Sequence, residues 1–178
     1  MPLIPRRTPV SIDLSDRQSL QHHIGQQIGV SSWHPISQAD IDTFGRLTRD
    51  EDAMHMDPAW ARQHSPFGVT IVYGFQTLSM LTAMINEILD RGSQEAYKLN
   101  YGFDRVRLMA PVAVDTPIRG VAKLSKIEDR GPDRFLVTIG MTVEIQGQEK
   151  PAVVADWLFM VVNGAEQERR PQMAGSST

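Results

Sequence analysis

One apolar segment, residues 75–89 (FQTLSMLTAMINEIL), most constrains how this chain can fold. Nine of its fifteen positions are apolar, and at helical spacing they spread over most of the circumference. A helix that is apolar nearly all round is expected to be buried on most of its sides. The rest of the chain must therefore supply a layer large enough to enclose it.

Four strand-like segments follow this helix and can form that layer. Residues 135–145 place an apolar side chain at every second position, which is typical of an antiparallel strand with one buried face. Turn signals separate the segments, and the other strands are expected at residues 97–112, 117–129 and 152–162. We therefore predict an α+β hotdog fold, in which an antiparallel sheet wraps around one long central helix.

The N-terminal part of the chain predicts shorter elements, identified mainly by their caps. Ser37 stands three residues before Asp40, which resembles a capping box, and the helix that it starts should end near Thr48. Asp57 followed by Pro58 is a favourable start for a second helix, with a loop before it. Two further elements are expected, namely a short helix that starts at Ser15 and closes at Gly25 or Gly29, and a strand at residues 30–37.

A single domain is expected over residues 16–162, between an irregular leader (1–15) and a mobile polar tail (163–178). The net charge of −3 gives no general attraction for nucleic acid or an anionic membrane. The absence of cysteine excludes disulfides and thiolate nucleophiles. The N-terminus has no apolar run of signal-peptide length, and no stretch of the chain approaches the length of a membrane span. We therefore expect a cytoplasmic protein with neither a nucleic-acid nor a membrane partner.

Residues 46–60 (RLTRDEDAMHMDPAW) hold the densest group of candidate functional side chains. Asp50, Asp52, His55 and Asp57 offer three interpretations: a metal cage, an acid/base pair, or a solvated loop ahead of a helix. Their spacing fits no zinc motif and lacks the glycine and glutamate of a calcium loop, so no metal is predicted. A carboxylate beside an imidazole can hold and activate one water molecule. The spacing alone leaves this reading and the solvated loop open.

Gly74 stands at the start of the apolar helix, where the first backbone N–H groups have no intrahelical acceptor and the helix dipole is positive. Because glycine has no side chain, a ligand carbonyl can approach its N–H closely. Such an N–H would stabilise an enolate-like oxygen as an oxyanion hole does. The alternative is an ordinary glycine at a loop-to-helix junction.

Three segments, in order along about residues 20–162, resemble the MaoC-like proteins, the (R)-specific enoyl-CoA hydratase family. FGRLTRDEDAMHMDPAWARQHSPFGVTIVYGFQTLSML is similar to the hydratase motif of the family. LNYGFDRVRLMAPVAVDTPIRG and KPAVVAD are similar to its later blocks, NYG…VRFPAPVPVGS and KPACVAE. The resemblance is closest to the short members with a single hotdog domain. It implies reversible syn addition of water to trans-2-enoyl-CoA, giving (R)-3-hydroxyacyl-CoA, with no cofactor besides the coenzyme A of the substrate.

The resemblance also assigns roles to individual residues. Asp50 and His55 match the catalytic pair of the family, and Gly74 matches the glycine whose N–H polarises the thioester carbonyl. Three positions depart from the pattern: Ala53 stands where the family commonly has Pro, and the other two are candidate substrate-binding residues. Tyr73 stands where the family has His, and Asp52 stands where it usually has Asn or Gln.

Further substrate contacts are expected from the strands and the central helix. Arg105 and Arg107 share one strand face and are candidates to bind the coenzyme A phosphates, with a solvated sheet face as the alternative. Phe75, Met80 and Met84 are candidate neighbours of the acyl chain, although core packing also explains them. The family resemblance implies a homodimer. Two other functions remain open: a hotdog acyl-CoA thioesterase, and an acyl-CoA-binding protein that has lost activity.

Overall fold

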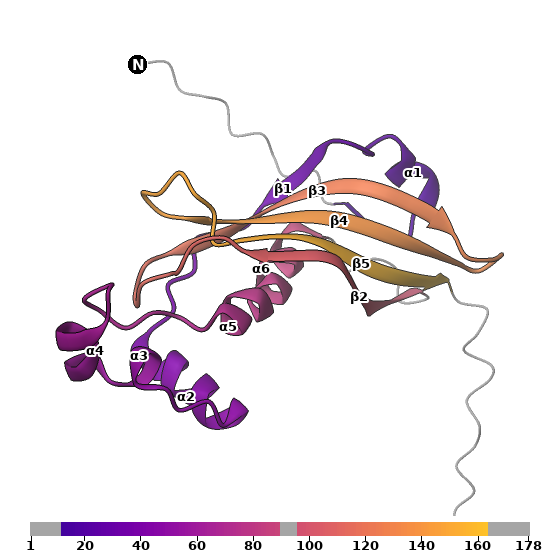
Figure 1. Ribbon diagram of the computed structural model, residues 1–178. Coiled ribbons are helices and arrows are strands. Elements are labelled where there is room, and N and C mark those ends of the chain that lie inside the picture. Colours follow the sequence, from indigo (N-terminus) through magenta and orange to yellow (C-terminus); the bar gives the residue numbers. More distant parts are fainter. Residues whose placement is uncertain (1–11, 90–95, 164–178) are drawn as a thin grey trace, which may run out of the picture.

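The computed structural model describes residues 12–89 and 96–163, which form a sheet with helices against one face (Figure 1). The five strands are antiparallel and lie in the order β1-β3-β4-β5-β2. Their bounds are Gln27–Val30 (β1), Ala96–Leu108 (β2), Ile118–Asp129 (β3), Arg134–Ile145 (β4) and Val153–Asn163 (β5). The prediction of four long strands after the helix is confirmed, although β2 ends at Leu108 rather than at residue 112.

The central helix is interrupted at one residue. It consists of α5 (Gly74–Ser79) and α6 (Leu81–Ile88), with Met80 between them. Met80 keeps right-handed backbone angles, and its carbonyl still accepts a hydrogen bond from Met84 N at 3.1 Å. The interruption therefore leaves the helix axis nearly continuous.

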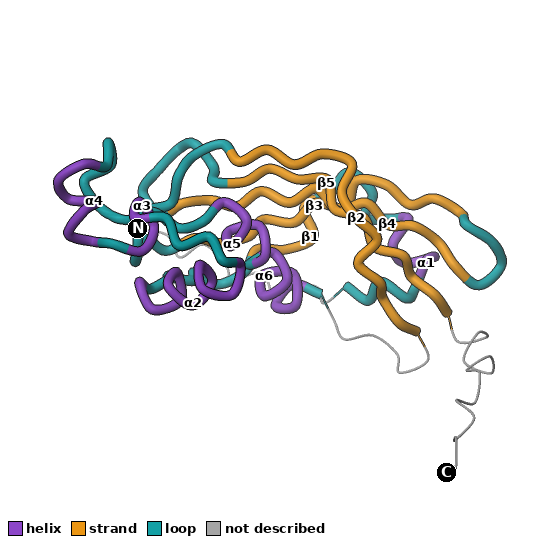
Figure 2. The backbone as a smooth tube through the Cα atoms, turned by 60° about the horizontal axis from the view of Figure 1, so that its bottom comes forward, coloured by secondary structure: helices purple, strands orange, loops and turns teal. Residues whose placement is uncertain are grey.

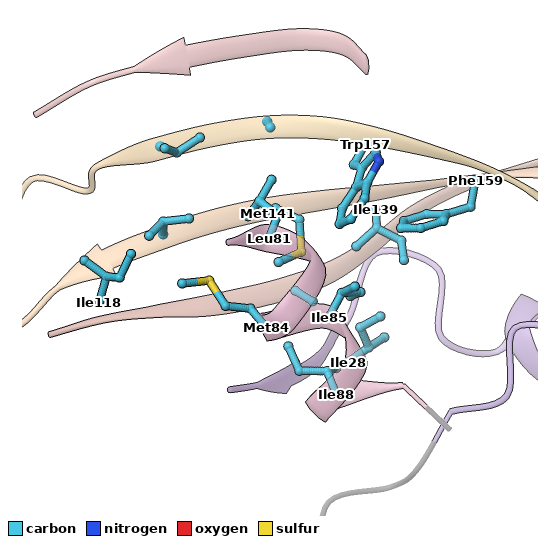
Figure 3. Close-up of a cluster of buried hydrophobic side chains, with 14 of the residues drawn as sticks. Ile28, Leu81, Met84, Ile85, Ile88, Ile118, Ile139, Met141, Trp157 and Phe159 are labelled. Atoms are coloured by element: carbon cyan, nitrogen blue, oxygen red, sulfur yellow. The ribbon is translucent and has the colours of Figure 1, made fainter. Parts of the chain in front are cut away.

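The sheet covers only one face of this helix. Side chains of β4 and β5, among them Met141, Trp157 and Phe159, project toward α6 (Figure 3). A Cβ atom at Gly120 of β3 would lie 2.9 Å from Met84 Cβ, so glycine permits the close approach of helix and sheet. Phe75, by contrast, is 72% exposed. The expected burial on most sides is therefore wrong for the described chain, because a single sheet covers a single face.

Three short helices gather beside α5 at one end of the sheet (Figure 2). The capping box of α2 (Gln38–Thr48) is confirmed, since Asp40 Oδ2 accepts from Ser37 N at 3.0 Å. The cap of α4 (Pro58–His64) is also confirmed, because Asp57 accepts from two backbone N–H groups at its start. Between them the expected loop contains one helical turn, α3 (Ala53–Met56).

Two elements near the N-terminus differ from their predictions. The first helix, α1, spans only Arg17–Gln21 and is capped by Asp16 rather than Ser15. The strand expected at residues 30–37 lies earlier, as β1, and pairs with β3. The positions of both elements depend on long-range pairing, which local patterns do not encode. One such contact is the hydrogen bond that Gly25 N donates to Leu124 O at 2.7 Å.

The folded unit includes part of the expected leader. Ile12 and Leu14 belong to the buried core, and Ile12 bridges to Leu89 beyond the end of α6. Residues 12–15 of the expected leader thus pack on the core without forming a helix or a strand. Residues 1–11 and the tail from 164 lie outside the described residues. Among the helices of the described part, none combines the length and the apolar character that a membrane span requires.

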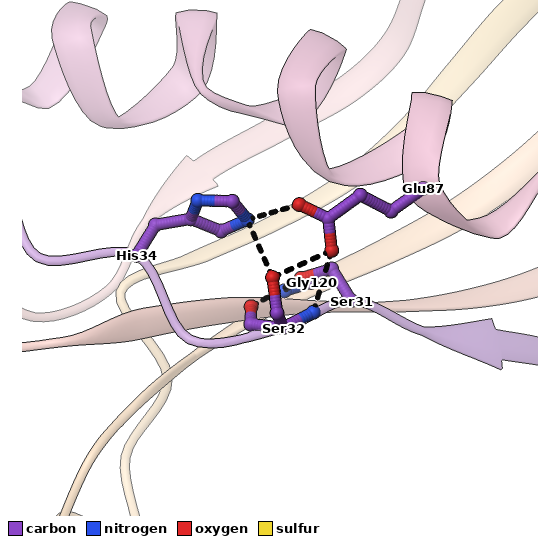
Figure 4. Close-up of polar contacts among 5 residues, drawn as sticks. All are labelled: Ser31, Ser32, His34, Glu87 and Gly120. Atoms are coloured by element: carbon purple, nitrogen blue, oxygen red, sulfur yellow. Dashed lines mark hydrogen bonds and ion pairs between the residues drawn. The ribbon is translucent and has the colours of Figure 1, made fainter.

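A polar cluster ties the chain after β1 to α6 (Figure 4). Glu87 accepts hydrogen bonds from Ser32 N and Ser32 Oγ, both at 2.7 Å, and lies 2.7 Å from His34 Nε2. Burial alone would raise the pKa of Glu87, but the bonds from Ser32 and the contact with His34 together hold this pKa below its usual value.

Candidate active site

His55 lies in α3, and a backbone carbonyl fixes its tautomer. Its Nδ1 is 2.7 Å from the carbonyl oxygen of Ile71. Because a carbonyl oxygen can only accept, Nδ1 carries the proton and donates it to this bond. The lone pair of a neutral imidazole is then on Nε2, which is free to take a proton from a ligand.

Three further contacts hold this imidazole and its backbone in place. The ring stacks on Tyr73, with ring centroids 3.8 Å apart. Gln38 Nε2 donates to the backbone carbonyl of His55 at 2.8 Å, and Thr70 Oγ1 donates to Gln38 Oε1 at 2.6 Å. Gln38 and Thr70 thus position the site without touching the pocket, and nothing in their sequence spacing indicates this role.

Gly74 begins α5 with an open backbone N–H. Tyr73 is the cap residue, but its side chain makes no capping bond, and the first helical bond runs from Thr77 N to Tyr73 O at 2.9 Å. The N–H of Gly74 therefore has no acceptor among the described residues. A Cβ atom at this position would lie 2.5 Å from Leu108 Cδ1, so any larger residue would displace the end of this half-exposed side chain.

His55 and Gly74 line the same pocket, which has a volume of about 210 Å³. Thr77 completes the helical wall, and residues 108–112 and 152–153 form the opposite wall. Most of these residues are apolar, so the pocket offers one proton acceptor and one N–H donor in apolar surroundings. This combination suits the polarisation of a carbonyl next to a proton transfer.

The structure does not bring the Asp50 side chain into this pocket. Asp50 is exposed after the end of α2, where Arg49 adopts the left-handed conformation with φ of 60°. Its backbone is fixed, because its N–H donates to Gly45 O at 3.0 Å and its carbonyl accepts from the Tyr73 hydroxyl. Its carboxylate has no hydrogen-bond or ion-pair partner within the described chain. A catalytic role for Asp50 stays a prediction.

Tyr73 and Asp52, the two expected substrate-binding residues, make their contacts outside the pocket. Tyr73 is 4% exposed, and its hydroxyl is used by the Asp50 carbonyl. Burial raises the pKa of Tyr73, and the nearby carboxylates of Asp50 and Asp52 raise it further, so the phenol stays a donor. Asp52 caps α3 by accepting from Met54 N at 2.8 Å. Neither side chain lines the pocket, and a substrate-binding role for Tyr73 and Asp52 stays a prediction.

The two arginines expected to bind coenzyme A lie on the far face of the sheet. Arg105 pairs with Asp156 at 3.2 Å, and Arg107 donates to the carbonyl of Val106. Their neighbour Leu108, which points to the opposite face, is the residue that lines the pocket. Arg105 and Arg107 do share one face, but alternation along β2 turns that face away from the helix.

The residues expected beside the acyl chain do not line the pocket either. Met84 is fully buried in the core against the sheet, and Phe75 is exposed away from the sheet. Met80 faces a separate groove between α2 and α5. Within residues 12–89 and 96–163, no three His, Asp or Glu side chains converge as metal ligands would. The expectation that the site works without a metal stays an expectation.

Residues 19–145 match the family model described as the MaoC like domain. This chain belongs to the MaoC-like family. Among its relatives, nodulation protein N of Rhizobium leguminosarum bv. viciae is 40% identical over 138 residues, which cover 78% of this chain and 86% of the relative. The 3-hydroxyacyl-thioester dehydratase Z of Mycobacterium tuberculosis (strain ATCC 25618 / H37Rv) is 37% identical over 139 residues, or 78% of this chain and 90% of the relative.

Solved structures establish the fold of this MaoC-like chain as a hotdog. The MaoC-like dehydratase from Rhodospirillum rubrum superposes with a TM-score of 0.66 at 21% identity, covering 83% of this chain and 94% of the other. The (R)-hydratase from A. caviae gives 0.62 at 20% identity, covering 76% and 94%. The sequence-based expectations of the family and of the α+β hotdog fold are confirmed.

Proposed function

We propose that this MaoC-like chain is a hydro-lyase that adds water reversibly and syn across trans-2-enoyl-CoA, giving (R)-3-hydroxyacyl-CoA. The observation that carries the proposal is that His55 and the open N–H of Gly74 share one apolar pocket. Membership of the MaoC-like family and the dehydratase among its relatives support the same class of reaction. Coenzyme A enters as part of the substrate, and the reaction needs no other cofactor.

The reaction balances with one imidazole and one amide. The thioester carbonyl accepts a hydrogen bond from Gly74 N–H, and a water oxygen bonds to C3 while His55 Nε2 takes a proton from that water. The electron pair of the C2–C3 double bond moves toward the carbonyl, and the N–H and the helix dipole stabilise the resulting enolate oxygen. The imidazolium then gives its proton to C2 on the face where the water was added.

Asp50 is proposed to hold the water from the side opposite His55. The Asp50 carboxylate has no hydrogen-bond or ion-pair partner within the described chain. The side chain can therefore turn toward bound substrate without breaking a hydrogen bond. The Tyr73 hydroxyl keeps the Asp50 backbone close to the His55 ring, on which Tyr73 stacks. The same group would also orient the water during dehydration.

The assembly is proposed to be a homodimer formed through β2. This strand of thirteen residues lies at one end of the strand order, and its outer edge pairs with no strand of the described chain. It exposes Tyr97, Leu99 and Tyr101. A long apolar edge strand tends to pair with another chain, and a second copy of β2 offers a matching edge.

One spectrophotometric experiment tests the function. The wild-type protein is mixed with crotonyl-CoA and, separately, with a longer enoyl-CoA and a saturated acyl-CoA, each in the presence of a thiol-trapping dye. A hydro-lyase removes the enoyl-thioester absorbance and releases no thiol. Thiol release from the saturated thioester would instead indicate a thioesterase, and the absence of both signals would indicate a binding protein.

A further inference from the structure

The candidate active-site pocket has an open end and a buried end. Leu108 and Met109, which are 50% and 40% exposed, mark the open end. Thr77 and Val153, which are 2% and 0% exposed, mark the buried end. A thioester that enters with its coenzyme A outside must therefore direct its acyl chain toward Thr77 and Val153.

A second pocket, of about 630 Å³, lies further along the same two strands. Its helical wall comes from residues 82–89, and its sheet wall comes from β2 and β5. On these strands the pair Leu108–Val153 belongs to the first pocket, and the pair Asn100–Phe159 belongs to the second. A volume of this size is typical of a small-molecule site and would hold a long acyl chain. An acyl chain that passed the buried end of the first pocket would therefore reach the second, if the space between them were open.

Apolar side chains fill the space between the two pockets. On β5 these are Ala155 and Trp157, and on the helix Leu81, all of them buried in the core. On β2 the facing residues are Val106, which pairs with Ala155, and Phe103, which pairs with Trp157. Both are partly buried and pack against the core. The first pocket therefore ends at these residues and does not continue into the second.

Trp157 is the largest of these side chains, and three contacts hold its ring in place. Its Nε1 donates to Asn100 Oδ1 at 2.7 Å. The ring stacks on Phe103, with ring centroids 5.6 Å apart, and its centroid lies 4.4 Å from that of Phe159. Figure 3 shows Trp157 and Phe159 projecting from β5 toward α6. Because rotation of the indole would break the hydrogen bond and both ring contacts, Phe103 and Trp157 form a fixed aromatic barrier.

The distance from the reacting carbonyl to the filled space limits the length of the acyl chain. Gly74 N–H, which would bind this carbonyl, lies beside Leu108, and Leu108 pairs with Val153. From Val153 to Ala155, where the filled space begins, β5 advances two residues, or about 7 Å. An extended chain of roughly five to six carbon atoms covers this distance. A longer chain would have to displace the aromatic barrier or leave through the open end.

We propose that Phe103 and Trp157 restrict this protein to thioesters of short acyl chains, of about four to six carbon atoms, by closing the route to the second pocket. The inference rests on the proposed function for its thioester head, and it adds the length of the acyl chain. In the wild-type protein the second pocket lies outside the path of the substrate.

Binding of unreactive ligands tests this proposal. Calorimetry compares butyryl-CoA with decanoyl-CoA, two saturated thioesters that differ by six methylene groups. Each methylene buried in an apolar channel tightens binding about fourfold, so an open route would favour decanoyl-CoA by more than about a thousandfold. The wild-type protein is expected to bind decanoyl-CoA at most about tenfold more tightly than butyryl-CoA. A larger gain, or no binding of butyryl-CoA, overturns the proposal.

A variant of the aromatic barrier localises the effect. Phe103→Ala removes the ring that stacks on Trp157 and should connect the two pockets, while the partial burial of Phe103 limits the cost to the fold. In this variant the affinity ratio of decanoyl-CoA to butyryl-CoA should rise at least about tenfold. Phe67→Ala removes the same ring from an exposed position that lines neither pocket, and should leave the ratio unchanged. An unchanged ratio in Phe103→Ala, folded by circular dichroism, also overturns the proposal.

Hydration of crotonyl-CoA by the wild-type protein is measured in parallel. Failure of hydration would contradict the proposed function, whereas the binding comparison alone decides whether the aromatic barrier limits the acyl chain. The wild-type comparison needs no variant, so it decides the proposal even if Phe103→Ala does not fold.

Discussion

Removing the Tyr73 hydroxyl tests how much its hydrogen bond to the Asp50 carbonyl contributes to stability and activity. Tyr73→Phe keeps the ring that stacks on His55 but removes the hydrogen bond to the Asp50 carbonyl. Such a bond contributes about 1 to 1.5 kcal/mol to the free energy of unfolding. For a unit of this size the melting temperature should fall by about 2 to 6 °C.

The activity of the same variant should fall in a specific way. Because the His55 ring keeps its partners, the KM for crotonyl-CoA should stay within about twofold, while kcat should fall by roughly three- to tenfold as Asp50 loses its position. Urea unfolding measures the change in stability, and initial-rate kinetics measure KM and kcat. As a control, Glu149→Gln in the exposed turn after β4 should alter the stability by less than about 0.5 kcal/mol. A Tyr73→Phe protein as stable as this control would refute the reasoning.

Three further predictions concern the pH response, Asp50 and the edge strand. The lowered pKa of Glu87 means that its contacts with Ser32 and His34 stabilise the fold above the unfolded pKa of about 4.3 and lose this effect as the pH falls through the folded value. Urea unfolding should therefore show Glu87→Gln less stable than wild type by about 1 kcal/mol at pH 7, a value already lowered because Glu87 is partly exposed. This difference in stability should disappear below about pH 4, and a difference that does not change with pH would contradict the prediction. Asp50→Asn should lower kcat for crotonyl-CoA at least about a hundredfold and shift the melting temperature by less than about 1 °C, and full activity would remove the assignment. Leu99→Lys should convert a dimer into a monomer in light scattering because like charges would meet across paired β2 edges, whereas a dimer of unchanged affinity would exclude this edge.

The strands and caps were predictable because their signals are local. Alternation over residues 135–145 and the turns on either side fix β4, and Ser37 and Asp57 start their helices through contacts within three residues. Local signals do not report which partner a segment meets. For this reason local patterns give the wrong bounds for β1 and α1. They also do not indicate that one face of the central helix stays exposed.

The candidate site was only partly predictable for a similar reason. His55 and Gly74 could be found because each carries its own chemistry, an imidazole and an unpaired helix N–H. The roles of Tyr73, Gln38 and the Ile71 carbonyl depend on contacts across 16 or more residues, which no local spacing encodes.

Strand β2 shows how small irregularities change which residues face the helix. Its pairing with β5 shifts register between Asn100 and Gly102 and again between Phe103 and Arg105. Each shift moves the inward position by one residue, so that Asn100, Phe103 and Val106 share a face that strict alternation would divide. Gly102, which has a positive φ, is a local sign of the first shift, whereas no glycine marks the second.

The central claim is that His55 Nε2 transfers the proton beside the Gly74 N–H. His55→Asn tests it most directly, because the asparagine amide can still donate to the Ile71 carbonyl while the Nε2 lone pair is removed. The measurement is kcat for crotonyl-CoA hydration, with circular dichroism to verify the fold. We predict a loss of roughly a thousandfold in a folded protein. A folded variant that retains kcat within about tenfold of wild type would contradict the account.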